Sequence, residues 1–201
     1  YMGVEHVEFR EALQELARRA GVELGTTPTV APEVDAHRNR LIEINELAAD
    51  LPGYWGYGTF DAPIVYAAIE DLKTRRPRVL YIMLGEGDEW AHEGRYDLYL
   101  DATRRADRFI ERIWTTLQSL PEYRDRTTLL VTTDHGRGAT LKDWSDHGKD
   151  VPAAEDTWMA ALGPAVPSLG VRKNLTVTTS QLAATIAAVV GEDFHAALPK
   201  T

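Results

Sequence analysis

Two short polar segments each combine a carboxylate with an imidazole, and both groups are common ligands of divalent metal ions. Asp88 and His92 are four positions apart, a spacing that one helical turn brings onto a single face. Asp134 and His135 are adjacent and precede Gly136, which lets the backbone approach a bound ion. The structural alternatives are a helix-capping Asp with an exposed His, and an ordinary corner between a strand and a loop.

A third imidazole strengthens the metal interpretation. His147 lies in a loop rich in carboxylates and glycine, whereas His6, His37 and His195 lie in helical or terminal contexts and are expected to be structural. Three imidazoles and two carboxylates suit zinc, and manganese is a plausible substitute. Five ligands exceed one tetrahedral site, so two metal sites are expected, with some ligands missing from this chain.

The pattern of apolar residues predicts the elements that position these ligands. An apolar run at 78–84 predicts a strand covered on both faces, and a β-branched run at 127–133 predicts another, with a third at 157–162. Helical periodicity predicts helices at 5–20, 38–49, 61–77, 96–120 and 180–190. Asp61 is placed to cap the helix that it begins.

Alternation of strands and helices predicts the α/β class, with a mostly parallel sheet and helices on both faces. We expect a helical segment at 1–60 to precede an α/β metal-binding core at 61–201 within the same domain. Ligand sites of such sheets lie beyond the carboxyl ends of the strands. Both carboxylate–imidazole pairs follow predicted strands, so we expect them to meet there with His147.

Composition limits the classes of function. The chain has 201 residues with 44% apolar content, enough to bury a core. The formal charge of −9 argues against binding of duplex nucleic acid, which needs clustered cations. The absence of cysteine excludes disulfides and thiolate metal ligands. The longest apolar stretches, at 182–190 and 79–84, are too short for a transmembrane helix.

The motifs, taken in order, resemble those of the alkaline phosphatase superfamily, which includes phosphatases, phosphodiesterases and nucleotide pyrophosphatases, sulfatases, and cofactor-independent phosphoglycerate mutases. The matching features are the D-x-x-x-H of Asp88 and His92, the T-x-D-H-G type run at 132–136, and the later His147 ahead of a Gly-Pro pair at 163–164. The resemblance covers about residues 61–191.

This resemblance implies an alkaline-phosphatase-like fold and a metal-dependent hydrolase of small phosphate esters. It implies that Asp88, His92 and His147 bind one metal ion, and that Asp134 and His135 bind the second. Zinc is the favoured metal and manganese the alternative. A mutase of the phosphoglycerate type, a sulfatase, or a domain that keeps metal only for its structure are the other interpretations.

Two further residues are candidates for substrate binding. Arg137 follows the Asp-His-Gly turn and Lys149 follows His147, so each could reach an oxygen of the substrate. Their structural alternative is that both are surface charges.

The chain also departs from the family pattern. Members of the superfamily have an Asp after their first strand and a Ser or Thr nucleophile, and neither is visible before Asp61. Thr26 and Thr27 resemble a nucleophile loop but lack the preceding strand. We therefore expect the nucleophile to lie upstream of Tyr1, with this chain as the C-terminal part of a larger enzyme. A periplasmic or secreted location would follow if that missing part carries a signal peptide.

Overall fold

The computed structural model describes residues 32–55, 60–173 and 175–197, and these residues fall into two compact units. The larger unit lies within the ranges Thr29–Arg76 and Leu80–Pro164. The smaller one comprises the described residues of Pro77–Val79 and Ala165–Thr201. The division of the chain into 1–60 and 61–201 stays a prediction, and the helix expected at 5–20 lies outside the described residues.

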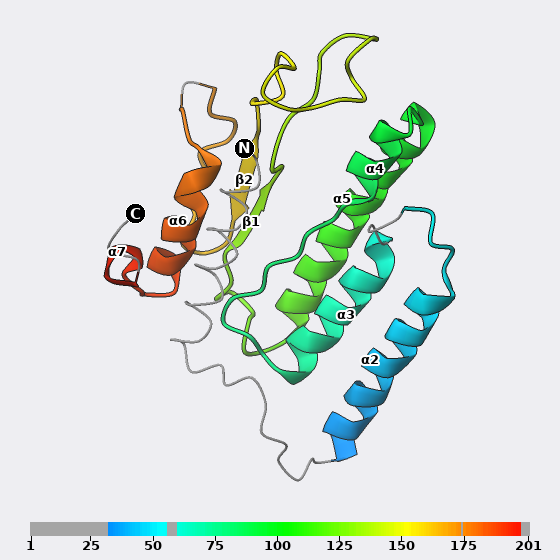
Figure 1. Ribbon diagram of the computed structural model, residues 1–201. Helices are drawn as coiled ribbons and strands as arrows, with labels where there is room; N and C mark the ends of the chain where they lie inside the picture. Colours follow the sequence, from blue (N-terminus) through cyan, green and yellow to red (C-terminus); the bar gives the residue numbers. More distant parts are fainter. Residues whose placement is uncertain (1–31, 56–59, 174, 198–201) are drawn as a thin grey trace. The chain divides into compact units, whose positions relative to one another are not determined.

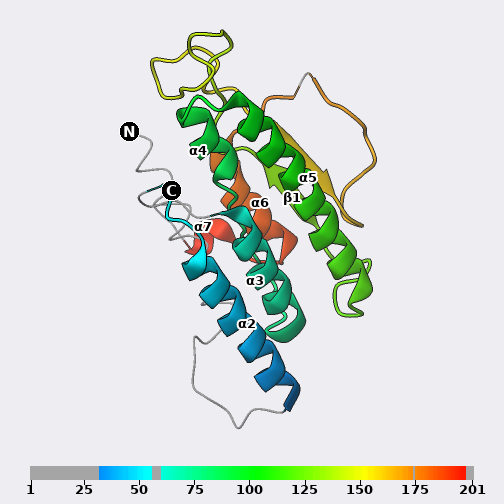
Figure 2. The same cartoon turned by 90° about the vertical axis from the view of Figure 1, so that its right-hand side faces the viewer.

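Helices dominate the described part of the larger unit. They are α2 (Pro32–Asp50), α3 (Asp61–Thr74), α4 (Glu86–His92) and α5 (Tyr96–Ser119). Helix α2 packs against α3, α3 contacts α5, and the short α4 packs against the first part of the long α5 (Figures 1 and 2). The helices predicted at 38–49, 61–77 and 96–120 are therefore confirmed, with shifted ends.

Proline sets the ends of two of these helices. Helix α3 stops before Arg76, which has a φ of 49° and precedes Pro77, because proline disfavours helical backbone in the residue before it. Helix α5 stops at Ser119, and Leu120 before Pro121 is extended with φ −94° and ψ 121°. The helix boundaries thus follow from local backbone sterics.

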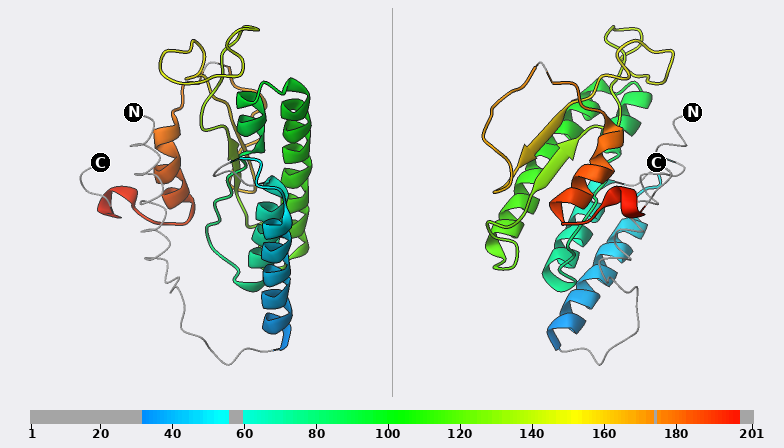
Figure 3. Two further views of the ribbon diagram at one scale, coloured as in Figure 1. Left: turned by 45° about the vertical axis from the view of Figure 1, so that its right-hand side comes forward. Right: turned by 90° about the vertical axis from the view of Figure 1, so that its left-hand side faces the viewer.

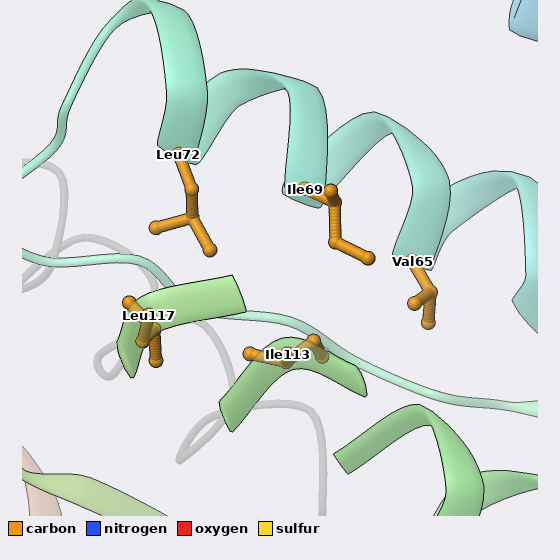
Figure 4. Close-up of a cluster of buried hydrophobic side chains, with 5 residues drawn as sticks. All are labelled: Val65, Ile69, Leu72, Ile113 and Leu117. Atoms are coloured by element: carbon orange, nitrogen blue, oxygen red, sulfur yellow. The ribbon is translucent and has the colours of Figure 1, made fainter. Parts of the chain in front are cut away.

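One apolar cluster joins α3 to α5. Val65, Ile69 and Leu72 point from α3 toward Ile113 and Leu117 of α5, and all five side chains are buried (Figure 4). Their spacing of three or four residues places them on one face of each helix. Removal of each such side chain from water stabilises the folded state by roughly 1.5–3 kcal/mol. This cluster is the main core of the larger unit.

The strand predicted at 78–84 is wrong. The structure has no strand at these residues. Ile82 and Leu84 pack against the α3–α5 cluster, while Tyr81 and Met83 are exposed, so only one face of the segment is covered. A strand needs a neighbouring strand in a sheet, and the sheet of the described residues consists of β1 and β2 alone.

The described residues contain one two-stranded sheet, and its strands are antiparallel. Strand β1 (Leu129–Thr132) pairs with β2 (Met159–Leu162) in the register Leu129 to Leu162, and a long loop rises from one end of the pair (Figure 3). Two of the predicted strands are confirmed with shorter bounds. The mostly parallel sheet is not confirmed, because the loop between β1 and β2 holds no crossover helix and returns the chain as a long hairpin.

The smaller unit contains a capped helix near the C-terminus. The helical elements of this unit are η1 (Thr179–Gln181), α6 (Leu182–Val189) and α7 (Phe194–Ala197). Thr178 and Gln181 form a capping box at the start of η1. Arg78 donates a 2.7 Å hydrogen bond to the Val190 carbonyl at the end of α6. The helix predicted at 180–190 is confirmed with this start. In the described part of the chain, no helix has the length and apolar character needed to cross a membrane.

Candidate metal centre

A buried polar network fixes the start of α4, the helix that carries Asp88 and His92. Oδ1 of Asp61 accepts hydrogen bonds from the backbone N–H groups of Gly85 at 2.7 Å and Glu86 at 3.2 Å. In return, the Asp61 N–H donates to Oε2 of Glu86 at 3.0 Å. Asp61 therefore caps α4 and not the helix that it begins, for which Phe60 is the N-cap, and this corrects the sequence prediction.

The Glu86 carboxylate links this cap to α5. Arg105 donates a 2.8 Å hydrogen bond to Oε1 of Glu86, and it also forms an ion pair with Asp101 one turn earlier in α5. Asp61 and Glu86 are only 2% and 3% exposed, so their charges need these partners. Sequence patterns did not reveal the role of Glu86 and Arg105, which are 19 residues apart and come together only in the fold.

Substitution of Asp61 tests this cap. Asp61→Ala leaves one buried and one part-buried N–H group without their acceptor, so we expect the free energy of unfolding to fall by about 1–3 kcal/mol for each N–H group. Asp61→Asn keeps an acceptor oxygen and should cost less. Urea denaturation of both variants would measure the difference, and equal losses would show that the hydrogen bonds of Asp61 do not hold α4.

The same variants have a predictable pH dependence. Burial raises the pKa of Asp61 above 3.8, despite the lowering effect of its hydrogen bonds to Glu86 and Gly85. A raised pKa in the folded state means that the wild type loses stability as the carboxyl group ionises on going up from pH about 4. The asparagine side chain of the Asp61→Asn variant does not ionise. The free energy of unfolding of Asp61→Asn, taken relative to that of the wild type, should therefore be higher at neutral pH than at pH about 4.

Asp88 and His92 face each other across one turn of α4. His92 Nε2 lies 3.4 Å from Oδ2 of Asp88, with both side chains partly exposed. The four-residue spacing seen in the sequence therefore brings the two groups together, as predicted.

Asp134 and His135 follow directly after β1. The Nδ1–H group of His135 is within hydrogen-bond reach of the Gly136 carbonyl at 2.8 Å, which leaves Nε2 as the free ring nitrogen. That Nε2 lies 3.8 Å from Oδ1 of Asp134 and 3.5 Å from Oδ1 of Asp88. The backbone itself thus orients the imidazole toward the carboxylate on α4.

His147 comes from the long loop between β1 and β2. The loop folds back on itself through the bond from the Gly138 N–H group to the Asp146 carbonyl at 3.2 Å. His147 Nε2 lies 3.5 Å from Oδ1 of Asp88 and 2.9 Å from Nε2 of His92. Its ring stacks on that of His135 with centroids 3.8 Å apart. The predicted convergence of Asp88 with the distant His147 is confirmed.

The three imidazoles share one feature that suits a metal site. Each presents its Nε2 atom to the Asp88 carboxylate, at 3.4 Å for His92 and 3.5 Å for both His135 and His147. Burial, together with the nearby His135 and His92, lowers the pKa of His147, so its ring is neutral at neutral pH. A neutral imidazole is the form that binds a metal ion. The donor set therefore fits a divalent cation.

The geometry also bears on the division of the ligands. Ligand atoms of Asp88, His135 and His147 all lie within 4.8 Å of one another. This trio combines residues that the family resemblance divides between two metal ions. The two predicted sites are thus adjacent, and their division stays a prediction.

The two candidate substrate residues differ in their surroundings. The Arg137 side chain is only 13% exposed and forms an ion pair with the Asp88 carboxylate. It also donates to the carbonyl oxygens of Ser145 at 3.0 Å and Asp88 at 3.2 Å, so it ties the His147 loop to α4. Burial lowers the pKa of Arg137, which nonetheless stays charged. Lys149 is exposed beside the loop.

The histidines expected to be structural lie elsewhere. His37 on α2 is bonded through Nδ1 to Oε2 of Glu70 on α3, at 2.7 Å. His195 lies on α7 in the smaller unit. His6 lies outside the described residues.

A family model described as the metalloenzyme superfamily matches residues 57–157, which is half of the chain and includes all five candidate ligands. The chain belongs to the metalloenzyme superfamily. This family is part of the alkaline phosphatase-like superfamily, whose members are generally enzymes and include phosphatases, mutases and sulfatases. Comparison with curated proteins and with solved structures gave no match. Membership supports an α/β fold and the binding of divalent metal.

Proposed function

We propose that this metalloenzyme-superfamily chain forms the metal-binding part of a two-metal hydrolase of phosphate esters, either a phosphatase or a phosphodiesterase. The observation that carries the proposal is the meeting of three imidazole Nε2 atoms around the Asp88 carboxylate, with Asp134 beside them. An Asp and His set of this kind, without thiolates, suits zinc best and also accepts manganese.

In this proposal, Asp88, His92 and His147 hold one metal ion, while Asp134 and His135 hold the other. Two such ions, when bound, would polarise the phosphoryl group and stabilise charge on its oxygens. The chain's own residues supply orientation. Asp61 and Glu86 fix α4, and the Gly136 carbonyl fixes the tautomer of His135.

Arg137 and Lys149 have separate parts in the proposal. Arg137 is a positioning residue first, because its guanidinium holds both the Asp88 carboxylate and the His147 loop. Lys149, exposed next to that loop, is the freer of the two to reach a substrate oxygen. A contact of either residue with substrate stays a prediction.

The nucleophile stays a prediction as well. No described residue is assigned to this role, and Thr26 and Thr27 lie outside the described residues. If the metal-loaded chain hydrolyses aryl phosphates, Thr26→Ala and Thr27→Ala will test the two hydroxyls. Loss of turnover in one variant would place the nucleophile within this chain and contradict the prediction that it lies upstream of Tyr1.

Product binding offers a test that needs no nucleophile. Zinc titration by calorimetry should give two bound ions per chain, and inorganic phosphate should then bind the zinc-loaded chain but not the metal-free chain. Asp134→Ala should reduce the zinc stoichiometry to one. Phosphate binding that does not depend on zinc, or a stoichiometry that Asp134→Ala leaves at two, would contradict the proposed site.

The same titration tests the division of the ligands. With three ligands against two, the Asp88 site should bind zinc more tightly than the Asp134 site, so His92→Ala should weaken the tight binding event and His135→Ala the weak one. If His135→Ala instead weakens the tight event, then Asp88, His135 and His147 form the stronger site, as their mutual distances allow.

Two other functions use the same ligands. A mutase would return the phosphoryl group to a second hydroxyl of its substrate, and a sulfatase would bind sulfate in preference to phosphate. Competition between sulfate and phosphate for the zinc-loaded chain separates the sulfatase from the phosphate-specific enzymes. If the chain binds zinc but the zinc-loaded chain binds neither phosphate nor sulfate, this result would favour a metal site that only stabilises the structure.

A further inference from the structure

Three aromatic side chains form a continuous group between α5 and the His147 loop. The rings of Tyr96 and Trp144 meet edge to face, with centroids 5.1 Å apart and an interplanar angle of 83°. Tyr99 lies 6.0 Å from Tyr96 and 6.1 Å from Trp144. We call these three residues the aromatic wall.

The aromatic wall is connected to the candidate ligands along the chain at two points. Tyr96 follows His92 by four residues, through a tight turn in which the Arg95 N–H group donates to the Trp90 carbonyl at 2.9 Å. Trp144 precedes His147 by three residues. The next residue, Ser145, is bonded through Arg137 to Asp88. The wall is therefore held to the centre by the same contacts that hold the ligands.

The aromatic core of this unit contains two tryptophans that are closed to solvent and Tyr54, which contacts both and is 55% exposed. Trp55 and Trp90 are packed 4.7 Å apart and are 7% and 8% exposed, so they have no surface to offer a ligand. Tyr96 is 54% exposed although it contacts two other rings. Tyr54 is exposed to the same extent, so the feature that sets Tyr96 apart is its place in the chain, four residues after the candidate ligand His92.

We propose that the aromatic wall contacts a planar ring in the alcohol part of the phosphate ester, and thereby selects esters of ring-bearing alcohols. A phosphoryl group held by the candidate ligands would project its ester group away from them. The wall follows His92 on α5 and precedes His147 in the loop, so it is the aromatic group next to two of these ligands in the chain. Aromatic rings favour edge-to-face or offset contact with another ring. This inference rests on the proposed function and names the substrate class for that site.

Binding to the zinc-loaded chain can test the wall. Phenyl phosphate should bind about two- to twelvefold more tightly than inorganic phosphate, the equivalent of ~0.5–1.5 kcal/mol for one aromatic pair. Adenosine 5′-monophosphate forms a second arm, because its ring is separated from the phosphate by a ribose. The ester whose affinity exceeds that of inorganic phosphate by the larger factor shows how far from the phosphate the wall holds a ring.

Variants show whether the gain comes from the wall. Tyr96→Leu should abolish the preference for phenyl phosphate or the nucleotide over inorganic phosphate, and Tyr96→Phe should restore it. The ratio of two dissociation constants is the readout, because general damage to the metal site weakens both ligands alike. Tyr66→Leu is the matched control, since Tyr66 is an exposed tyrosine on α3 that contacts Arg112.

The outcomes separate this inference from the proposed function. If the zinc-loaded chain binds inorganic phosphate but Tyr96→Leu leaves the ratio unchanged, the wall only packs the loop and the inference is wrong. If both ring-bearing esters bind no more tightly than inorganic phosphate, the inference is also wrong while the metal site stands. Absence of zinc-dependent phosphate binding would overturn the proposed function and this inference together.

Discussion

Asp88→Ala is expected to abolish the tight zinc binding that we propose for this chain. Among the described residues, Asp88 is the one carboxylate that all three imidazole Nε2 atoms approach within 3.5 Å, so its loss takes a candidate ligand from the centre of the group. The variant also leaves the buried guanidinium of Arg137 without its ion-pair partner. We expect the zinc affinity to fall by more than the roughly 10- to 100-fold that loss of an outer-shell partner costs.

A metal-indicator competition assay on wild type and variant would measure this loss. Asp150→Ala is the matched control, because Asp150 is an exposed carboxylate of the same loop but is not among the candidate ligands. Its zinc affinity should equal that of the wild type. Equal affinities for Asp88→Ala and the wild type would mean that zinc binds elsewhere and that this carboxylate is only the partner of Arg137.

Gly136→Ala will disrupt the corner that carries Asp134 and His135. A Cβ atom at position 136 would lie 2.3 Å from the Asp156 carbonyl oxygen and 2.5 Å from that of Ala153. Both contacts are with backbone, which cannot move away as a side chain can. We expect the free energy of unfolding to fall by about 1–3 kcal/mol or more, as in other overpacked sites. Zinc affinity should fall too, because the adjacent ligands must shift.

Gly87→Ala is the matched control for this substitution. Gly87 lies in α4 between Glu86 and Asp88, and a Cβ atom there would meet nothing within 4 Å. Alanine in a helix is favoured over glycine by roughly 0.5–1 kcal/mol, so this variant should be at least as stable as the wild type. Chemical denaturation of the two variants gives the comparison. A Gly136→Ala variant as stable as Gly87→Ala would show that the loop tolerates a shift of its backbone.

For Gly136, the sequence predicted the need for glycine but not its cause. The sequence suggested that this glycine lets the backbone approach a bound ion. In the structure, the close neighbours are the carbonyl groups of residues 153 and 156, which belong to the far end of the same loop. The need for glycine was visible in the sequence, but its cause depends on a contact between distant residues.

Local patterns determined the pairing of Asp88 with His92 and the ends of two helices. Asp88 and His92 meet because one turn of α4 separates them, and Pro77 and Pro121 end their helices through steric effects on the preceding residue. These outcomes depend on interactions within about four residues, so the sequence contains all that decides them.

The tertiary structure decided everything that depends on which distant segments meet. It turned Asp61 into the cap of α4 and brought Arg137 onto Asp88 and the His147 loop. It also paired β1 with β2 in the antiparallel direction and left residues 80–84 without a neighbouring strand among the described residues. A short apolar run has the same pattern in either kind of sheet, or in none, because side-chain alternation does not record the partner. The partner is chosen by the packing of the whole unit, which no local pattern contains.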